Sequence, residues 1–125
     1  MRLFGLKSCD TCRKALGALA ARGIAVEVID VRADGVSEAD RAAIVAAFGA
    51  AAINRASTTW RSLGEADRAL DPGALLAAHP TVMKRPVIED GGVWHLGWTA
   101  EVQAAVLARG GSVSGRAISG QSSSG

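Results

Sequence analysis

The sequence predicts an α/β domain with a mixed four-stranded sheet, and three observations carry that prediction. A short apolar stretch near the N-terminus precedes a segment with helical spacing, and a second apolar stretch follows it. Two more apolar stretches flank a glycine turn near the C-terminus. A length of 125 residues, 49% of them hydrophobic and 21% charged, suits one soluble domain with a single core.

The N-terminal third of the chain predicts a β-α-β unit. Arg2 to Leu6 has the pattern of a strand, and helical spacing runs from Thr11 to Arg22. Gly23 suits the end of this helix, because glycine readily adopts the left-handed conformation of a C-cap. Ile24 to Val31 predicts a second strand. The apolar face of the helix consists of Cys12, Ala15, Leu16, Leu19 and Ala20.

The middle of the chain is predicted to be helical. Ser37, with Asp40 three residues later, resembles a capping box with Asp in place of Glu and predicts a helix that ends near Phe48. Proline suits the first position of a helix, where its missing N–H costs nothing. Three further segments are expected: a connector from Gly49 to Thr58, a helix from Trp60 to Leu70, and a helix that Asp71 caps and that runs from Pro72 to Ala78.

The C-terminal third predicts a hairpin and a last helix. Val87 to Glu89 and Val93 to Leu96 are expected to pair around a tight glycine turn. A final helix is expected from Thr99 to Ala108. The order β-α-β, helices, β-β-α is that of a thioredoxin-like fold with a helical insert.

The composition sets the domain boundary and excludes several classes of function. We predict a domain over residues 1–109 and a flexible tail over 110–125, since that segment is rich in Gly and Ser and has little to bury. The net charge is only +2, with no basic cluster, so nucleic-acid binding is not expected. No apolar run approaches the length of a membrane span or signal peptide, and we expect a cytoplasmic protein without membrane contact.

Two cysteines mark the candidate reactive site. Cys9 directly precedes the first predicted helix, where unpaired backbone N–H groups favour the thiolate over the thiol. Cys12 lies one turn further on the same helix face. We expect the positive charges of Lys7, Arg13 and Lys14 to lower the pKa of Cys9 further.

Other side chains that could carry chemistry receive structural interpretations. A zinc site would need Cys9, Cys12 and both histidines, and these lack zinc-finger spacing, so no metal is expected. His79 and His95 are expected to be packed or at the surface. The three tryptophans, Trp60, Trp94 and Trp98, are expected to pack in the core or at its rim.

Four separated segments together resemble the arsenate-reductase-like family. They are Phe4 to Ala15, Asn54-Arg55 with Thr58 to Leu63, Lys84 to Ile88, and Leu96-Gly97-Trp98. The resemblance runs from Met1 to about Leu107. The family has three branches: arsenate reductases, glutathione-linked YffB-type thiol reductases, and Spx-type regulators. The second and fourth segments are most similar to the YffB-type branch.

This resemblance implies roles for particular residues. Cys9 aligns with the nucleophilic cysteine of the family, and Arg55 and Arg85 align with two of three arginines that hold an oxyanion. The third falls near Gly97, so arsenate turnover is expected to be weak. Pro86 is expected to follow a cis peptide bond. The predicted binding set comprises Arg55, Arg85, Pro86, Thr11 and Arg13.

The function implied is that of a thiol oxidoreductase. The Cys9 thiolate would attack a small oxyanion or disulfide substrate, and glutathione or another small thiol would resolve the adduct as a co-substrate rather than a bound cofactor. Cys12 could instead resolve it and form a Cys9–Cys12 disulfide. The alternative implied by the Cys-x-x-Cys spacing is an Spx-type redox-sensing regulator that binds the RNA polymerase α-subunit.

Overall fold

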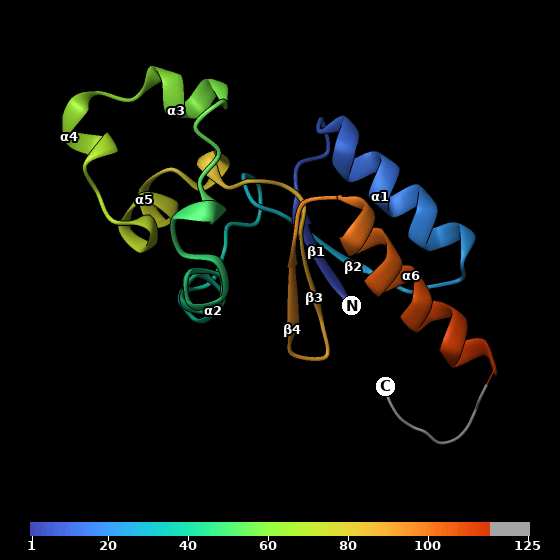
Figure 1. The fold of residues 1–125 in the computed structure, drawn as a ribbon. Coiled ribbons are helices and arrows are strands. Elements are labelled where there is room, and N and C mark those ends of the chain that lie inside the picture. The colour runs from blue at the N-terminus through green and yellow to red at the C-terminus, as the bar shows by residue number, and fades with distance from the viewer. Residues whose placement is uncertain (116–125) are drawn as a thin grey trace.

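A mixed four-stranded sheet forms the centre of the protein, as predicted. The computed structural model describes the backbone of residues 1–115 and the side chains of residues 1–108. The strands are β1 (Arg2–Gly5), β2 (Glu27–Asp30), β3 (Val87–Asp90) and β4 (Val93–Leu96), in the spatial order β2-β1-β3-β4 (Figure 1). β1 is parallel to β2 and antiparallel to β3, and β3 is antiparallel to β4.

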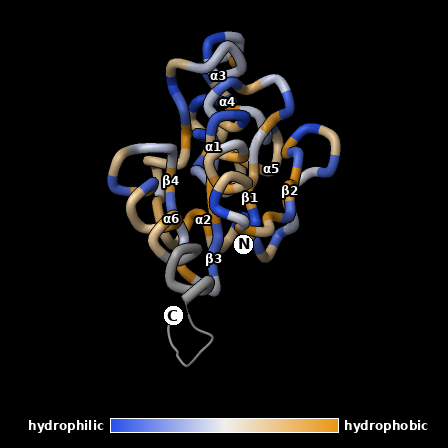
Figure 2. Tube along the Cα trace, turned by 90° about the vertical axis from the view of Figure 1, so that its right-hand side faces the viewer, coloured by the Kyte–Doolittle hydropathy of each residue, from blue (hydrophilic) through white to orange (hydrophobic). Residues whose placement is uncertain are grey.

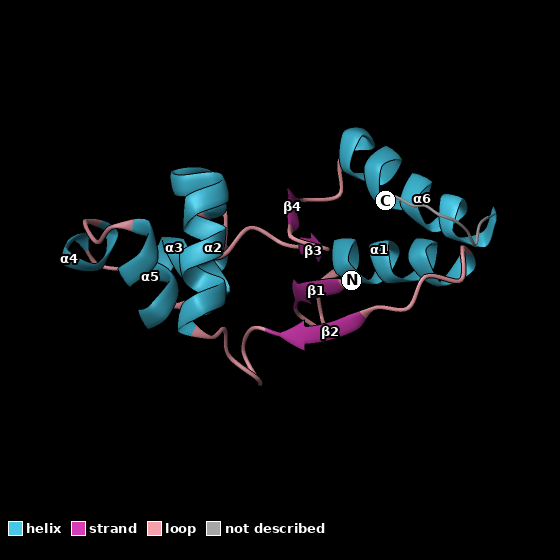
Figure 3. Cartoon of the chain, turned by 90° about the horizontal axis from the view of Figure 1, so that it is seen from below, coloured by secondary structure: helices cyan, strands magenta, loops and turns pink. Residues whose placement is uncertain are grey.

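One face of the sheet is covered by α1 (Asp10–Ala21) and α6 (Ala100–Gly115), which lie side by side in Figures 1 and 3. Leu3 of β1 pairs with Ile88 of β3, and both side chains point toward these helices. Alternate residues of a strand point to opposite faces, so Phe4 and Val87 point the other way. The core under the two helices is completed by Cys12, Ala15, Leu19, Val102 and Val106.

The helical insert lies on the other face, on the side of the sheet away from α1 and α6 (Figure 3). Its helices α2 and α5 pack against each other, and Ile44 and Leu75 join Phe4 in the second core. The insert consists of α2 (Glu38–Phe48), η1 (Gly49–Ala52), α3 (Thr58–Ser62), α4 (Glu65–Arg68), α5 (Pro72–Ala78) and η2 (Pro80–Val82). The predicted order of a thioredoxin-like fold with a helical insert is therefore confirmed.

Two predicted helix starts are confirmed by their caps. The Ser37 hydroxyl accepts a hydrogen bond from the backbone N–H of Asp40 at 3.1 Å, which satisfies an otherwise unpaired amide of α2. The Asp71 carboxylate accepts from the N–H of Ala74 at 2.8 Å, and Pro72 opens α5.

The predicted single helix from Trp60 to Leu70 is wrong, because the chain forms the two short helices α3 and α4 there. Leu63 and Gly64 between them have extended backbone, with ψ of 144° and 173°. Glycine is a poor helix former, since it loses the most backbone freedom when it is fixed. This extended pair separates two segments that helical periodicity joins into one helix.

The last helix ends later than predicted. α6 continues to Gly115, beyond the expected end near Ala108, so residues 110–115 of the predicted tail are helical. No proline interrupts this stretch, and glycine costs a helix only about 1 kcal/mol relative to alanine, which does not by itself stop it. The rest of the predicted tail, 116–125, lies outside the described residues.

Arg2 joins the sheet to the insert. Its guanidinium donates to both carboxylate oxygens of Asp40 in α2, at 2.9 and 3.1 Å, and to Glu89 in β3 at 3.0 Å. It also lies over the rings of Phe4 and Trp94, at 5.2 and 5.8 Å from their centroids. These hydrogen bonds hold the pKa of Arg2 above its ordinary value. The contacts fix the start of α2 on the sheet.

The distribution of hydropathy agrees with two cores on either side of one sheet. In Figure 2 the hydrophobic segments gather in the middle of the molecule, around β1 and α1, and several outer loops are hydrophilic. Trp94 stacks on Phe4, with ring centroids 5.8 Å apart, and Trp60 and Trp98 pack against the two cores. The predicted packing roles of the tryptophans are confirmed. Within residues 1–115, no helix has both the length and the apolar character needed to cross a membrane.

Candidate functional site

Cys9 lies at the predicted position, at the N-cap of α1. Its backbone is extended, with φ −84° and ψ 118°, and its carbonyl accepts the first hydrogen bond of the helix from Arg13 N–H at 3.0 Å. Its own N–H donates to the Leu6 carbonyl at 3.1 Å, which ties the turn after β1 together. The side chain is half-buried and packs against both cores. The sulfur is thus positioned by the sheet and by the helix.

The surroundings of Cys9 favour its thiolate. Partial burial raises the pKa of this thiol. Hydrogen bonds to the sulfur from the side chain and the backbone N–H of Cys12 lower the pKa. The Arg85 guanidinium lowers the pKa as well, through a hydrogen bond and through its positive charge. The net effect is a pKa below the ordinary value, in the predicted direction. A thiolate is the reactive form of cysteine, so this residue is the candidate nucleophile.

Cys12 has the opposite character. Its side chain is 2% exposed, and burial, together with the neighbouring Cys9, raises its pKa to about 12. The backbone N–H of Leu6 faces its sulfur and offsets only part of this increase. Cys12 is therefore a protonated thiol near neutral pH. In that state it donates a hydrogen bond to Cys9 and is not itself a nucleophile.

Gly5 makes room for Cys12, a requirement that sequence reasoning missed. A Cβ atom built at Gly5 would lie 2.5 Å from the Cys12 Sγ, closer than non-bonded atoms approach. A small cavity of about 50 Å³ lies beside this contact, between β1, α1 and β2. A glycine at the end of a strand, in front of the turn that leads to a cysteine-bearing helix, was the available signal for such a close approach.

Arg85 is held firmly beside Cys9. Its Nη1 donates to the carbonyls of Thr81 and Met83, at 2.7 and 3.1 Å. Its Nε is buried and has no hydrogen-bond partner among the described residues. The peptide bond between Arg85 and Pro86 is cis, as predicted. Two backbone carbonyls thus fix the guanidinium, which also hydrogen-bonds to the Cys9 sulfur.

The turn that carries Arg85 is braced by a pair of threonines. The hydroxyl groups of Thr59 in α3 and Thr81 in η2 lie 2.7 Å apart and share a hydrogen bond. Thr81 also supplies the carbonyl that accepts from Arg85. Sequence reasoning did not identify Thr81, because the pairing joins residues 22 positions apart.

The other basic residues near Cys9 have less influence than expected. Arg13 forms an ion pair with Asp10 and donates to the carbonyl of Lys7 at 3.2 Å, and its side chain is 60% exposed. Thr11 is exposed on the first turn of α1. The main groups that lower the pKa of Cys9 are Cys12 and Arg85, rather than the predicted Lys7, Arg13 and Lys14.

Arg55, the second predicted anion ligand, lies in the insert. Its side chain is exposed and its guanidinium carbon lies 5.5 Å from the centroid of the Trp60 ring. It is not among the main groups that shift the pKa of Cys9. The structure thus brings one of the two predicted arginines to the sulfur and places the other on an aromatic ring.

Gly97 lies where the family resemblance places a third arginine. It is buried and has φ +81°, a conformation that favours glycine, and its N–H donates to the Pro86 carbonyl at 2.8 Å. Its backbone conformation forms the turn after β4, and its hydrogen bond ties that turn to Pro86. Gly97 therefore contributes neither a side chain nor a free amide to an anion.

Neither histidine is among the main groups that shift the pKa of Cys9. His79 Nε2 is 3.5 Å from Asp67, and His95 is half-buried in β4 opposite Ile88. The two histidines therefore make no main contribution to the activation of Cys9.

Among the described residues, no three His, Cys, Asp or Glu side chains are grouped as a metal site would require.

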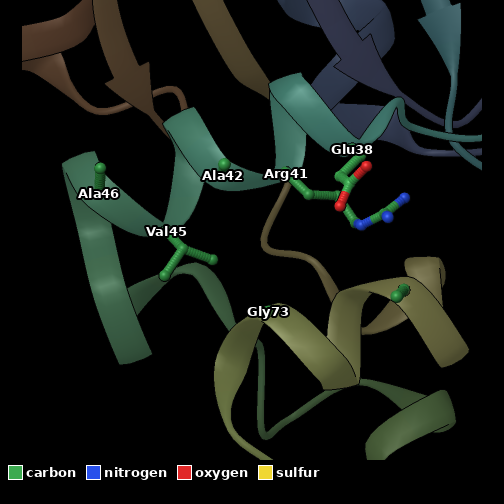
Figure 4. A pocket seen from close by; sticks show the side chains of 7 residues that line it. Glu38, Arg41, Ala42, Val45, Ala46 and Gly73 are labelled. Carbon is green, nitrogen blue, oxygen red and sulfur yellow. The ribbon is translucent and has the colours of Figure 1, made fainter.

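A separate groove lies between α2 and α5. It has a volume of about 460 Å³ and is lined mostly by small residues. Figure 4 shows Glu38 and Arg41 at one end of the groove and Val45 and Ala46 toward the other. None of the predicted site residues lines it, so it is not part of the cysteine site.

Comparison with known proteins relates this site to a family. The ArsC family model matches residues 4–106. An uncharacterized protein of Haemophilus influenzae is 38% identical over 109 residues, which cover 82% of this chain and 96% of that protein.

Solved structures show the same relationship. The YFFB (PA3664) protein is 35% identical, with a TM-score of 0.75 over 85% of this chain and 97% of that one. An arsenate reductase (ArsC) related protein from Brucella melitensis is 29% identical, with a TM-score of 0.61 over 83% and 91%. An arsenate reductase from Vibrio cholerae, 20% identical with a TM-score of 0.68 over 86% and 97%, shares the fold. With a cysteine at the head of α1 and an Arg-Pro turn beside it, this chain belongs to the ArsC family.

Proposed function

We propose that this protein is a thiol oxidoreductase that uses the Cys9 thiolate as its nucleophile and glutathione as its co-substrate. The observation that carries the proposal is the setting of Cys9. The thiol is half-buried at a helix N-terminus, with its pKa lowered by Cys12 and Arg85. The relatives named YFFB and arsenate reductase support the same class of chemistry.

The proposed reaction is a thiol–disulfide exchange on a small mixed disulfide of glutathione. The Cys9 thiolate attacks the glutathione sulfur, a Cys9–glutathione disulfide forms, and the other half of the substrate leaves as a thiolate. A second glutathione thiolate attacks that adduct, so glutathione disulfide leaves and the Cys9 thiolate returns. The net reaction converts one mixed disulfide and one glutathione into one substrate thiol and one glutathione disulfide, and the enzyme is unchanged.

Arg85 is the proposed anion-binding residue at the sulfur. Its guanidinium hydrogen-bonds to the Cys9 sulfur, and a guanidinium binds carboxylates and oxyanions well because its charge and geometry are fixed. Thr11 and Arg13 on the first turn of α1, and the Pro86 backbone, complete the proposed binding set around Cys9.

Cys12 is the slower of the two proposed resolving groups. A thiol with a pKa of about 12 is almost entirely protonated near neutral pH, and only its thiolate could attack a Cys9 adduct. Formation of the adduct removes the negative charge of Cys9, which is one of the causes of that high pKa, but the burial remains. External glutathione is therefore the main resolving thiol in this proposal.

Arsenate is proposed to be a poor substrate. The position of the third arginine holds Gly97, whose N–H already donates to Pro86. Loss of one donor to a developing negative charge typically lowers a rate by about a hundredfold or more. Rapid glutathione-dependent reduction of arsenate would contradict this part of the proposal.

The test of the proposal is the pKa of Cys9 measured in the intact protein. The rate of alkylation of Cys9, mapped by peptide mass spectrometry, is followed against pH with and without glutathione. We expect a midpoint below about 8.5, the value of an ordinary free cysteine. A midpoint at or above that value would overturn the proposal and leave only the family and the fold.

A second candidate function rests on the contact between Cys9 and Cys12. Two free cysteines that hydrogen-bond could form a disulfide on oxidation, as a redox-sensing regulator of the Spx type requires. In that case the protein would bind the RNA polymerase α-subunit. A pull-down with purified α-subunit, carried out with reduced and oxidised protein, separates the two functions. Redox-dependent capture would favour the regulator, and its absence would favour the enzyme.

A further inference from the structure

Two arginines of the insert stack on one tryptophan. The guanidinium carbons of Arg55 and Arg68 lie 5.5 and 5.4 Å from the centroid of the Trp60 ring. All three residues line a small pocket formed by η1, α3, α4 and α5. Neither Cys9 nor Arg85 lines it. This pocket is distinct from the cysteine site.

The two guanidinium groups keep donors available for a ligand. No described residue accepts a hydrogen bond from the Arg55 guanidinium, which contacts the Trp60 ring. Arg68 uses Nε and Nη2 on the carbonyls of Trp60 and Arg61, at 3.1 to 3.3 Å, which fixes the guanidinium in place. Its Nη1 has no such bond. No acidic side chain among the described residues forms an ion pair with either arginine.

The interior of the pocket is apolar. Its volume is about 100 Å³, and Ile53, Pro72 and Leu75 are among the residues that line it. At roughly 30 Å³ per water molecule, this volume holds about three waters, which is the size of a small branched aliphatic group. Burial of such a group is favourable in proportion to its apolar area. The pocket therefore combines an apolar interior with two cationic groups.

We propose that this pocket binds a small carboxylate that carries an apolar group, such as the last residue of a peptide with an aliphatic side chain. The aliphatic group would lie against Ile53 and Leu75, and the carboxylate would accept hydrogen bonds from Arg55 and Arg68. A carboxylate fits better than a phosphate, because most of the lining offers no donors for further oxygens. The site goes beyond the proposed thiol chemistry, which uses neither arginine.

Isothermal titration calorimetry with N-acetylleucine tests this assignment on the full chain. N-acetylleucinamide has the same apolar group without the charge, and acetate has the charge without the apolar group. We expect each to bind at least about fivefold more weakly than N-acetylleucine, since each lacks one half of the recognition. Equal binding of the acid and the amide, or no detectable binding of the acid, would overturn the proposal.

Variants locate the binding. Arg55→Gln is the cleanest, since Arg55 makes no hydrogen bond to the described residues, and we expect it to weaken N-acetylleucine binding about fivefold. Arg61→Gln is the matched control, because Arg61 is an exposed arginine of α3 that does not line the pocket, and binding should be unchanged. Equal losses in both variants would indicate only nonspecific attraction and would overturn the site.

Cys9→Ser distinguishes failure of this site from failure of the proposed enzyme. The variant removes the nucleophile and should leave N-acetylleucine binding unchanged, because Cys9 does not line the pocket. Loss of binding in Cys9→Ser would place the ligand at the cysteine site and overturn this inference. A normal Cys9 pKa with intact N-acetylleucine binding would overturn only the proposed function.

Discussion

Arg85 and Arg55 show how differently two arginines can be used in one small domain. Arg85 is half-buried, donates to two carbonyls and faces the sulfur of Cys9. Arg55 is exposed in the insert, and its recorded contact is the ring of Trp60. Backbone carbonyls near Arg85 hold its guanidinium in place beside the sulfur. The guanidinium of Arg55 keeps its hydrogen-bond donors available for a ligand.

The same contrast extends to the regions around them. The cysteine region combines the end of β1, the head of α1 and the turn before β3, so its geometry depends on both sheet cores. The Trp60 region is built entirely from the insert. The hydrogen bond between Thr59 and Thr81 links α3 to the turn of Arg85, but it involves none of the residues that line the Trp60 pocket. We therefore expect substitutions in that pocket to leave the cysteine site largely unchanged, and the experiments below test this separation.

The largest difference between the two regions is expected in the rate of glutathione-dependent reduction, when Cys9 or Arg55 is replaced. Cys9→Ser should lower glutathione-dependent reduction of a glutathionylated peptide by about a thousandfold or more, as removal of a covalent nucleophile typically does. Arg55→Gln should change that rate by less than about threefold, because Arg55 is not a main influence on Cys9. Both rates come from the same coupled assay of glutathione disulfide. A comparable loss in the two variants would make Arg55 part of the cysteine site.

The anchor between sheet and insert should affect stability more than reactivity. Arg2→Ala removes three hydrogen bonds to half-buried carboxylates, and we expect unfolding in urea to become easier by about 2–3 kcal/mol. The pKa of Cys9 should remain unchanged, because Arg2 is not a main cause of its shift.

Arg32→Ala is the matched control for Arg2→Ala. Arg32 is exposed, and its side chain makes no hydrogen bond to the described residues, so the free energy of unfolding should change little. If Arg2→Ala also raised the pKa of Cys9, the position of the insert would control the cysteine site, and the two regions would not be independent.

The cysteine region was predictable because its key relations are local. Cys9 and Cys12 lie one helical turn apart, and helix geometry alone places both at the head of α1. The caps at Ser37 and Asp71 were predictable for the same reason, since each side chain reaches an amide three residues later. The strand order also followed from short local patterns and from the family resemblance.

The remaining features depend on contacts between distant segments. Nothing near Cys9 in the sequence indicates that Arg85, 76 positions later, supplies the positive charge that Lys7 and Arg13 were expected to supply. The contact of Gly5 with the Cys12 sulfur requires the relative placement of β1 and α1. The break at Leu63 and Gly64 likewise depends on how α3 and α4 pack, which helical periodicity does not describe.

Cys12 gives the cysteine region a characteristic dependence on pH. Its folded-state pKa of about 12 lies above an unfolded value of about 8.5, so the unfolded chain loses this proton first as pH rises. The stabilisation is complete below pH 8.5 and declines between 8.5 and 12. From pH 8 to 10 we expect a loss of about 2 kcal/mol in the free energy of unfolding in urea, at about 1.36 kcal/mol per pH unit.

Cys12→Ala isolates this contribution from other groups that titrate in the same range. Cys9 partly offsets this loss near pH 8.5, because a group with a lowered pKa gains stabilisation until the pH exceeds its unfolded pKa. The difference between wild type and Cys12→Ala should therefore shrink by about 2 kcal/mol or slightly less over the same interval. A constant difference would mean that Cys12 ionises in the folded protein as readily as in the unfolded chain.

The smallest of these effects is the most informative about the source of Cys9 reactivity. Arg85→Gln removes a charge and a hydrogen bond from the thiolate, and we expect the pKa of Cys9 to rise. Alkylation at a fixed pH below the pKa should then slow severalfold, because the thiolate fraction falls as the pKa rises. Arg13→Gln is the control, since Arg13 is closer in sequence but pairs with Asp10. Equal slowing in both variants would mean that positive charge around the head of α1 acts without regard to its geometry, and Arg85 would lose its special role.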